Sequence, residues 1–189
     1  MGDWMRQKRR QVVTISGELG SGKSTVARVL ADRLGWLYYS TGMAQRTIAN
    51  EMGITTIELN KLAITNRSID EKIDAVFKNP PWGNKPCIVD SRLAFYFLPN
   101  SFKVCLTVDP LVAAKRIFHD KTRSGESKYK TIKQAMEARE KRRELELKHF
   151  IKNYKLDIEN QYNFDLVIDT SLLNVEQVCD IILSHISVK

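Results

Sequence analysis

The 189-residue sequence contains no apolar run near the roughly 20 residues that a membrane-spanning helix needs. Its basic start, MGDWMRQKRR, leads into an expected strand and not into an apolar signal core, so we expect no secretory signal. Cysteine is scarce: Cys87, Cys105 and Cys179 are far apart and lie among apolar residues. An odd number of scattered cysteines argues against a disulfide framework or a metal site, and predicts reduced core residues in a cytoplasmic protein.

Internal repeats and low-complexity tracts are also missing, and a composition of 43% hydrophobic and 28% charged residues is ordinary for a single globular domain. The net charge of +8 is unevenly distributed. Four basic residues and one acid fall in residues 1–10, and eleven basic residues and four acids fall in residues 115–143. A basic surface can attract nucleic acid or anionic lipid, but it equally suits a pocket for several phosphates.

Short apolar runs alternate with longer amphipathic segments along the chain. The runs predict strands at residues 11–16, 36–39, 87–90, 104–108 and 166–169. Helices are expected at residues 23–34, 110–119, 132–154 and 175–187, and residues 43–79 are expected to be largely helical. Because strands that alternate with helices pair in parallel, the sequence predicts an α/β fold with about five parallel strands flanked by helices.

The segment GELGSGKST, residues 17–25, matches G-x-x-x-x-G-K-[ST] at every position and lies between an expected strand and an expected helix. Glycines let successive backbone N–H groups converge on one anion, and the helix adds its positive end. Lys23 can then reach the β- and γ-phosphates, and Ser24 can ligate a bridging magnesium ion. The sequence therefore predicts a P-loop NTPase fold that binds ATP and Mg²⁺ through Gly17, Glu18, Leu19, Gly20, Ser21, Gly22, Lys23, Ser24 and Thr25.

Polar segments follow three of the expected strands, at the sheet edge where α/β proteins bind ligands. They are STGMAQR at residues 40–46, VDSR at 89–92 and TVDP at 107–110. Arg46 and Arg92 are expected near Lys23, because arginine forks suit phosphate geometry. Asp90 ends an apolar strand, so it is a candidate to hold magnesium or to orient the acceptor; a carboxylate that caps the following turn is an equally good interpretation.

Taken in order, GELGSGKST, STGMAQR, VDSRL, LTVDP and YNFDLVIDTS resemble the cytidylate kinase family of nucleoside monophosphate kinases over about residues 11–186. The resemblance implies phosphorylation of a nucleoside monophosphate, most readily CMP or dCMP, by a monomer. It implies a core at residues 11–42, 85–119 and 160–187, a helical region that binds the monophosphate at 43–82, and a lid at 120–131. It also implies that Thr41, Arg46 and Arg92 hold the acceptor monophosphate.

In that family, an acid and an arginine three residues apart on the helix after the lid recognise the cytosine. Here Glu146 stands at the acid position, Arg142 matches an arginine one turn earlier, and His149 stands where the family has arginine. Histidine is shorter and only partly charged near neutral pH. The base that is recognised therefore stays open, and a base contact and an ordinary helix position are both open for His149.

The basic segment 115–143 brackets the polar loop DKTRSGESKYKT. A nucleotide kinase must keep water from the transferring phosphoryl group, and arginines on a closing loop can supply charge there. Ordinary ion pairs of a solvated helix, such as Glu137 with Lys141, account for some of these charges. The candidate catalytic residues are Lys23, Arg92, Arg116 and Arg123, with Arg139, Arg142 and Arg143 at the far edge of the lid.

Other functions are open from the sequence. The acceptor could be AMP, UMP or a small metabolite, as in shikimate or gluconate kinases. A protein of another class, an ATPase that binds RNA or the ribosome through its basic faces, would use the same loop. Against that class, the positive charge lies mainly around the expected lid, and no recognised RNA-binding signature is found. We therefore expect a nucleoside monophosphate as partner, and neither a membrane nor a nucleic acid.

Overall fold

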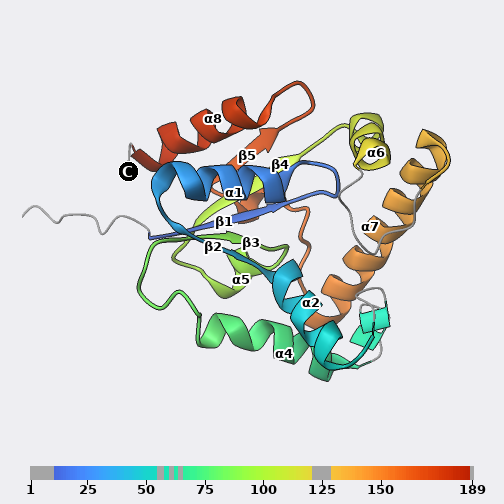
Figure 1. The fold of residues 1–189 in the computed structure, drawn as a ribbon, viewed down its shortest axis with the longest axis horizontal. Coiled ribbons are helices and arrows are strands. Elements are labelled where there is room, and N and C mark those ends of the chain that lie inside the picture. The colour runs from blue at the N-terminus through green and yellow to red at the C-terminus, as the bar shows by residue number, and fades with distance from the viewer. Residues whose placement is uncertain (1–10, 55–57, 60–61, 64–65, 121–128, 188–189) are drawn as a thin grey trace, which may run out of the picture.

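The computed structural model describes residues 11–54, 58–59, 62–63, 66–120 and 129–187, and contains one parallel sheet (Figure 1). Its strands lie in the order β2-β3-β1-β4-β5, with every neighbouring pair parallel. The predicted α/β fold with five parallel strands is therefore confirmed. The strands are β1 (Val12–Gly17), β2 (Leu37–Ser40), β3 (Cys87–Asp90), β4 (Phe102–Thr107) and β5 (Leu166–Asp169).

Helices cover both faces of the sheet and extend beyond the carboxyl ends of its strands. In Figure 1, α1 (Lys23–Leu34) and α8 (Val175–Ser187) lie together on one face, and α4 (Arg67–Lys78) and α5 (Ala94–Phe97) lie on the other. Three helices lie toward the carboxyl ends of the strands: α2 (Thr41–Glu51), α6 (Pro110–His119) and α7 (Ile132–Tyr154). A short 3₁₀ helix, η1 (Gln161–Asn163), precedes β5.

The helices with clear periodicity match the sequence prediction closely, since α1, α6, α7 and α8 begin and end at the predicted residues. The expected helical region is less continuous: α2 ends at Glu51, and α4 begins after Asn66, whose side chain accepts a hydrogen bond from the backbone N–H of Ser68. The sequence analysis missed α5 and η1, because one turn is too short to show a helical period. Most of the expected lid, at residues 121–128, lies outside the described residues.

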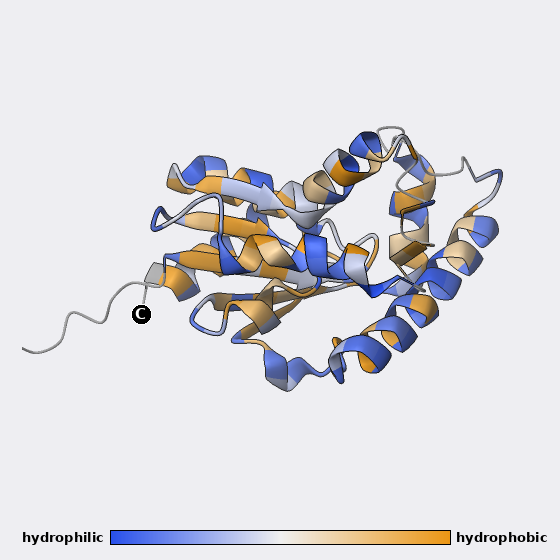
Figure 2. Ribbon diagram, turned by 90° about the horizontal axis from the view of Figure 1, so that it is seen from below, coloured by the Kyte–Doolittle hydropathy of each residue, from blue (hydrophilic) through white to orange (hydrophobic). Residues whose placement is uncertain are grey.

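The main hydrophobic core lies between the sheet and the helices α1 and α8, where the apolar faces of strands and helices meet (Figure 2). Fully buried side chains such as Ile15, Leu30 and Ile182 meet there. The three cysteines are buried and free, as predicted, and burial raises the pKa of the Cys87 thiol to about 12. None of the helices in the described part of the chain is both long enough and apolar enough to span a bilayer.

The end of β1 provides a test of the fold. Gly17 has a φ of 145°, which other residues rarely adopt, and an added Cβ would collide with the carbonyl oxygen of Leu106 in β4. We expect Gly17→Ala to lower the free energy of unfolding by about 3 kcal/mol or more. Gly53→Ala is the matched control, since Gly53 also has a positive φ of 67° but open space around it. It should cost about 1 kcal/mol, and equal losses in urea denaturation would contradict the collision.

Candidate active site

The phosphate loop joins β1 to α1 and packs against α6. Gly20 has a φ of 88°, and a Cβ there would lie 2.8 Å from the Cβ of Ala113 in α6. Only glycine therefore fits between the loop and this helix. Because α1 begins at Lys23, the first backbone N–H groups of the helix, which have no partner within it, lie next to the loop.

The carbonyl groups of the loop are held by donors from distant parts of the chain. The Leu19 carbonyl accepts a hydrogen bond from Arg139 Nε at 3.3 Å, and the Gly20 carbonyl accepts one from Arg116 Nη1 at 3.4 Å. The Ser21 carbonyl accepts one from Thr170 Oγ1 at 3.0 Å. In a trans peptide the N–H points opposite to the C=O. Fixing the Leu19 and Ser21 carbonyls therefore fixes the directions of the Gly20 and Gly22 N–H groups, which an anion would contact. The Ser21 N–H donates to the Glu18 carbonyl at 3.2 Å.

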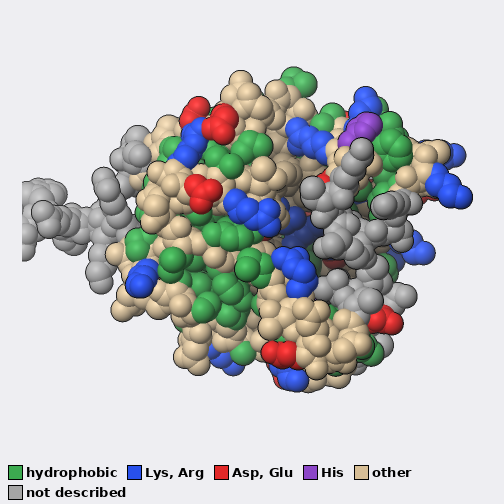
Figure 3. All heavy atoms as spheres, in the orientation of Figure 1, with side chains coloured by type: hydrophobic (Ala, Val, Ile, Leu, Met, Phe, Trp, Pro, Cys, Tyr) green, Lys and Arg blue, Asp and Glu red, His purple; other side chains and the backbone are tan. Residues whose placement is uncertain are grey.

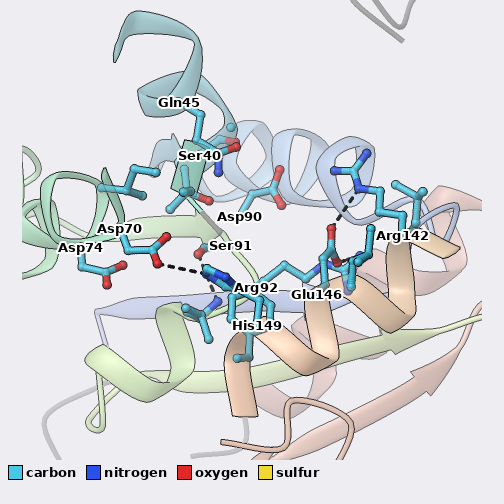
Figure 4. Close-up of a pocket in the computed structure, with 18 of the residues that line it drawn as sticks. Ser40, Gln45, Asp70, Asp74, Asp90, Ser91, Arg92, Arg142, Glu146 and His149 are labelled. Carbon is cyan, nitrogen blue, oxygen red and sulfur yellow. Dashed lines mark hydrogen bonds and ion pairs between the residues drawn. The ribbon is translucent and has the colours of Figure 1, made fainter. Parts of the chain in front are cut away.

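A cavity of about 570 Å³ lies beside this loop (Figure 4). Its wall is formed by the loop, the ends of β2 and β3, and the helices α2, α4 and α7. On the face seen in Figure 3, lysine and arginine side chains gather around a recess near α6 and α7. The polar residues of the lining are Lys23, Ser24, Ser40, Thr41, Gln45, Asp70, Asp74, Asp90, Ser91, Arg92, Lys141, Arg142, Glu146, His149 and Tyr154.

One end of the cavity gathers cations around a single carboxylate. Glu146 Oε1 accepts a hydrogen bond from Arg142 Nε at 2.9 Å, and Glu146 Oε2 lies 3.0 Å from Arg92 Nη2. That second oxygen is buried, and its contact with Arg92 lacks the geometry of a hydrogen bond. Burial alone would raise the pKa of Glu146, but Arg92 and Arg142 outweigh it and lower the pKa. The carboxylate is therefore charged and holds two arginines together.

Lys23 lies in the same electrostatic environment. It is half-buried, and burial followed by repulsion from Arg92 lowers its pKa to about 8, while Asp90 and Glu146 oppose the shift. A partly desolvated cation near other cations is costly. An incoming polyanion such as a phosphate chain would relieve that cost, so this end of the cavity is suited to bind phosphates.

Two groups in the lining could hold a magnesium ion. Asp90 is 4% exposed and one of its oxygens accepts a hydrogen bond from Tyr38 at 3.2 Å, and Ser24 presents a hydroxyl to the same cavity. Among the residues that the structure describes, no group of three or more His, Cys, Asp or Glu could hold a metal by itself. Magnesium takes one or two protein oxygens and completes its shell with phosphate and water oxygens, so Ser24 and Asp90 fit it.

The part of the cavity between α4 and α7 is acidic. Asp70 Oδ2 lies 3.0 Å from His149 Nε2, and Tyr154 donates a hydrogen bond of 2.7 Å to Asp74. Burial raises the pKa of both carboxyl groups, that of Asp74 to about 6. In Figure 4, these carboxylates lie on the side away from Arg142 and Glu146. The cavity is therefore polarised, with cations at the phosphate loop and carboxylates at α4.

Half of the eighteen site residues predicted from the sequence line this cavity. From the loop and the strand ends, Lys23, Ser24, Thr41, Asp90 and Arg92 do so, and α7 adds Arg142, Glu146 and His149. Leu19 also lines it, while the rest of the loop runs alongside. The fold thus brings these nine residues together, and the role of each stays a prediction.

Two predicted arginines do not line the cavity. Arg46 is exposed, although Gln45 and Gly42, which lies one helical turn before Arg46, both line the cavity. Arg116 binds the Gly20 carbonyl and the hydroxyl and carbonyl of Thr170, and it does not line the cavity. Arg123 lies outside the described residues.

Sequence reasoning missed the acidic pair on α4. Asp70 and Asp74 are four residues apart and adjoin the buried apolar positions Ile69, Ile73 and Phe77. An acidic pair at this spacing, at the edge of a strongly apolar helix face, is the signal that could have indicated them. No motif contains them, and their proximity to α7 depends on the fold.

Comparisons with known proteins identify the family of this chain. The sequence pattern of the "Cytidylate kinase-like family" matches residues 12–172. A cytidylate kinase of Archaeoglobus fulgidus is 35% identical over 178 residues, which cover 94% of this chain and 95% of that protein. An S-adenosylmethionine-dependent nucleotide dehydratase of Lacinutrix mariniflava is 32% identical over 174 residues, 92% of this chain but only 35% of that longer protein.

The fold is also found among solved kinase structures. A shikimate kinase from Bacteroides thetaiotaomicron superimposes with a TM-score of 0.64 over 93% of this chain and 98% of its own, at 13% sequence identity. Identity this low indicates a shared fold and nothing about the acceptor. Together with the five-stranded parallel sheet, it confirms the P-loop kinase fold expected from the sequence.

The acidic part of the cavity predicts a pH dependence of stability. Because burial raises the pKa of Asp74 from 3.8 to about 6, the folded protein keeps a proton between these values that the unfolded chain has released. The free energy of unfolding should therefore fall as the pH rises through this window. In Asp74→Asn, the decrease in the free energy of unfolding over this window should be smaller than in wild type by about 1–2 kcal/mol, after allowance for solvent screening. The introduced amide keeps an acceptor for Tyr154.

Urea denaturation from pH 4 to pH 7 measures this difference. Glu71→Gln is the control, because Glu71 is exposed on the same helix and pairs only with Arg67 in the described structure, at 3.4 Å. It should retain the wild-type slope, and an unchanged slope in Asp74→Asn would show that Asp74 does not titrate in this window.

Proposed function

The chain belongs to the cytidylate kinase-like family, and from that premise we propose that it transfers the γ-phosphoryl group of ATP to CMP and dCMP, forming the diphosphates. Its relatives and its fold identify a phosphotransferase of the nucleoside monophosphate kinase type. The observation that carries the proposal is the polarised cavity, in which Lys23, Arg92 and Arg142 gather beside the phosphate loop and carboxylates lie at α4.

The phosphate loop supports ATP as the donor. Its N–H groups and the first turn of α1 contact the β- and γ-phosphates, and Lys23 neutralises the charge that develops between them. Ser24 and Asp90 would hold magnesium, which would supply positive charge that stabilises the leaving group. Because Lys23 already lines the cavity beside the loop, it needs little rearrangement to act on the transferring group.

Arg92 and Arg142 support an acceptor that carries a phosphate. In the proposed complex they bind the acceptor phosphate and turn one of its oxygens toward the γ-phosphorus. That oxygen forms the new P–O bond in line with the bond to the β–γ bridging oxygen, which breaks and leaves on ADP. Since the attacking oxygen is anionic near neutral pH, catalysis needs positioning and charge neutralisation and no strong general base.

The acidic part of the cavity supports a base that carries an amino group. Asp70 is held by His149 at 3.0 Å and by Asn153 at 3.2 Å, so its carboxylate is fixed in the cavity wall. A carboxylate accepts a hydrogen bond from an exocyclic amine, and a site built for that donor rejects an analogue that lacks it. Cytosine has this amine and uracil does not. His149 then acts through Asp70, in place of the arginine that the family has.

Several expectations stay predictions within this proposal. They are the role of residues 43–82 in binding the monophosphate, the lid at residues 120–131, the monomeric state and the cytoplasmic location. The contact of Arg46 with the acceptor phosphate also stays a prediction, since its exposed side chain does not line the cavity while that of Gln45 does.

The donor end is tested by Lys23→Ala. Loss of the ammonium removes charge from the transferring group, so kcat should fall about 10³-fold or more while the fold remains intact. A coupled assay of ADP release measures the rate, and circular dichroism reports the fold. Lys133→Ala is the control, because Lys133 is exposed on α7, and it should retain wild-type kcat. Near-normal turnover in Lys23→Ala would refute the mechanism.

The acceptor is tested by a panel of CMP, dCMP, UMP, AMP, shikimate and gluconate in the same assay. We expect kcat/KM for CMP and dCMP to exceed that for UMP by about 10²-fold or more, because UMP has no exocyclic amine to donate to Asp70. Activity on a metabolite alone would refute the nucleotide acceptor. ATP hydrolysis that no acceptor stimulates would refute the kinase function and favour an ATPase.

A further inference from the structure

Arg139 is a buried guanidinium that the proposed chemistry does not use. It lies on α7 and is 3% exposed. It forms an ion pair with the Glu18 carboxylate, its Nε donates to the Leu19 carbonyl at 3.3 Å, and Glu140 lies at 3.4 Å. A buried charge is tolerated only where partners replace the lost water. The position of Arg139 is therefore closely determined by the phosphate loop.

These contacts join the donor side of the cavity to the acceptor side. Glu18 and Leu19 belong to the phosphate loop, and Leu19 lines the cavity. Along α7, Arg142 follows Arg139 after about one turn and Glu146 after about two, and both of these residues line the cavity. One side chain thus fixes the loop relative to the helix that carries an acceptor-binding arginine.

The geometry distinguishes this role from direct phosphate binding. Arg139 does not line the cavity, whereas its helix neighbours Ala138, Lys141 and Arg142 do. It holds the C=O of the peptide between Leu19 and Gly20, so the Gly20 N–H of that trans peptide points away from Arg139. The guanidinium therefore contacts the carbonyl side of the loop, and a phosphate would approach the N–H side.

We propose that Arg139, acting through Glu18 and the Leu19 carbonyl, is a positioning residue that preorganises the phosphate loop and sets its place relative to α7. The proposal rests on the kinase function proposed above. It assigns Arg139 no contact with either nucleotide. Its consequence is that loss of Arg139 weakens ATP binding and slows transfer but leaves binding of the acceptor alone unchanged.

The decisive variant is Glu18→Gln, because the two possible roles of Arg139 predict opposite changes in the affinity for an ATP analogue. If Arg139 positions the loop through Glu18, Glu18→Gln weakens binding of a non-hydrolysable ATP analogue by about 3–10-fold and lowers kcat. If Arg139 is a phosphate ligand held back by Glu18, the same change frees it, and the analogue binds more tightly. Tighter binding would overturn the proposal. Calorimetric titration measures the dissociation constant, and the coupled assay measures kcat.

Arg139→Met should raise the dissociation constant of the analogue by about 10-fold and lower kcat by about 10–100-fold, in line with the loss that a small misplacement causes. The dissociation constant of CMP alone should stay within about 2-fold of wild type. Since this variant leaves the half-buried Glu18 without its partner, Glu18→Gln/Arg139→Met guards against misfolding. The double variant should have the same dissociation constant and kcat as Arg139→Met, because both substitutions break the same contact between Glu18 and Arg139. Wild-type binding and kcat in the double variant would overturn the proposal.

Arg143→Met is the matched control on the same helix. Arg143 also binds carboxylates, those of Glu140 and Glu159, but it is 37% exposed and has no contact with the loop among the described interactions. It should leave the dissociation constant of the analogue within about 2-fold. An effect equal to that of Arg139→Met would indicate a general loss of helix charge and would overturn the proposal.

Amide hydrogen exchange in the nucleotide-free protein provides a readout that needs no catalysis. In Arg139→Met, a peptide that covers residues 17–25 should exchange several-fold faster than in wild type, while the strands β1 and β4 keep their protection. Unchanged exchange in that peptide would overturn the proposal. If no monophosphate accepts a phosphoryl group from wild type, the proposed function fails, whereas binding of the analogue and exchange still decide the role of Arg139.

Discussion

The carbonyl groups of the phosphate loop impose the constraint on which the rest of the site depends. A backbone that presents its N–H groups to an anion must find donors for the opposite carbonyls. Here the donors come from three distant segments: Thr170 after β5, Arg116 in α6 and Arg139 in α7. Side chains from the end of the sheet and from two helices thus meet at a few peptide groups of the loop. The loop is ordered by the whole fold and not by its glycines alone.

The same convergence explains how much the sequence could predict. Lys23 and Ser24 are part of a local motif, and Asp90 and Arg92 follow a strand end, so local patterns place them at the correct edge of the sheet. The contact between Glu18 and Arg139 joins positions more than a hundred residues apart and belongs to no motif. Arg46 shows a subtler limit. It follows the cavity-lining Gly42 by one helical turn, yet its side chain is exposed and only its neighbour Gln45 lines the cavity.

The basic end and the acidic end of the cavity are held by different ion pairs. Arg92 and Arg142 are balanced by the single carboxylate of Glu146, whereas Asp70 and Asp74 meet His149 and Tyr154. Where the family has an arginine, histidine pairs with a carboxylate on the facing helix.

The burial of the cysteines has a practical consequence for the study of this protein. Cys87, Cys105 and Cys179 are all 8% exposed or less, and burial raises the pKa of each thiol, so little reactive thiolate is present near neutral pH. Maleimide dyes attached to cysteines introduced on the exposed faces of α4 and α7 would thus meet almost no competing background. The unaltered wild-type cysteines therefore leave the protein ready for fluorescence energy transfer between these two helices.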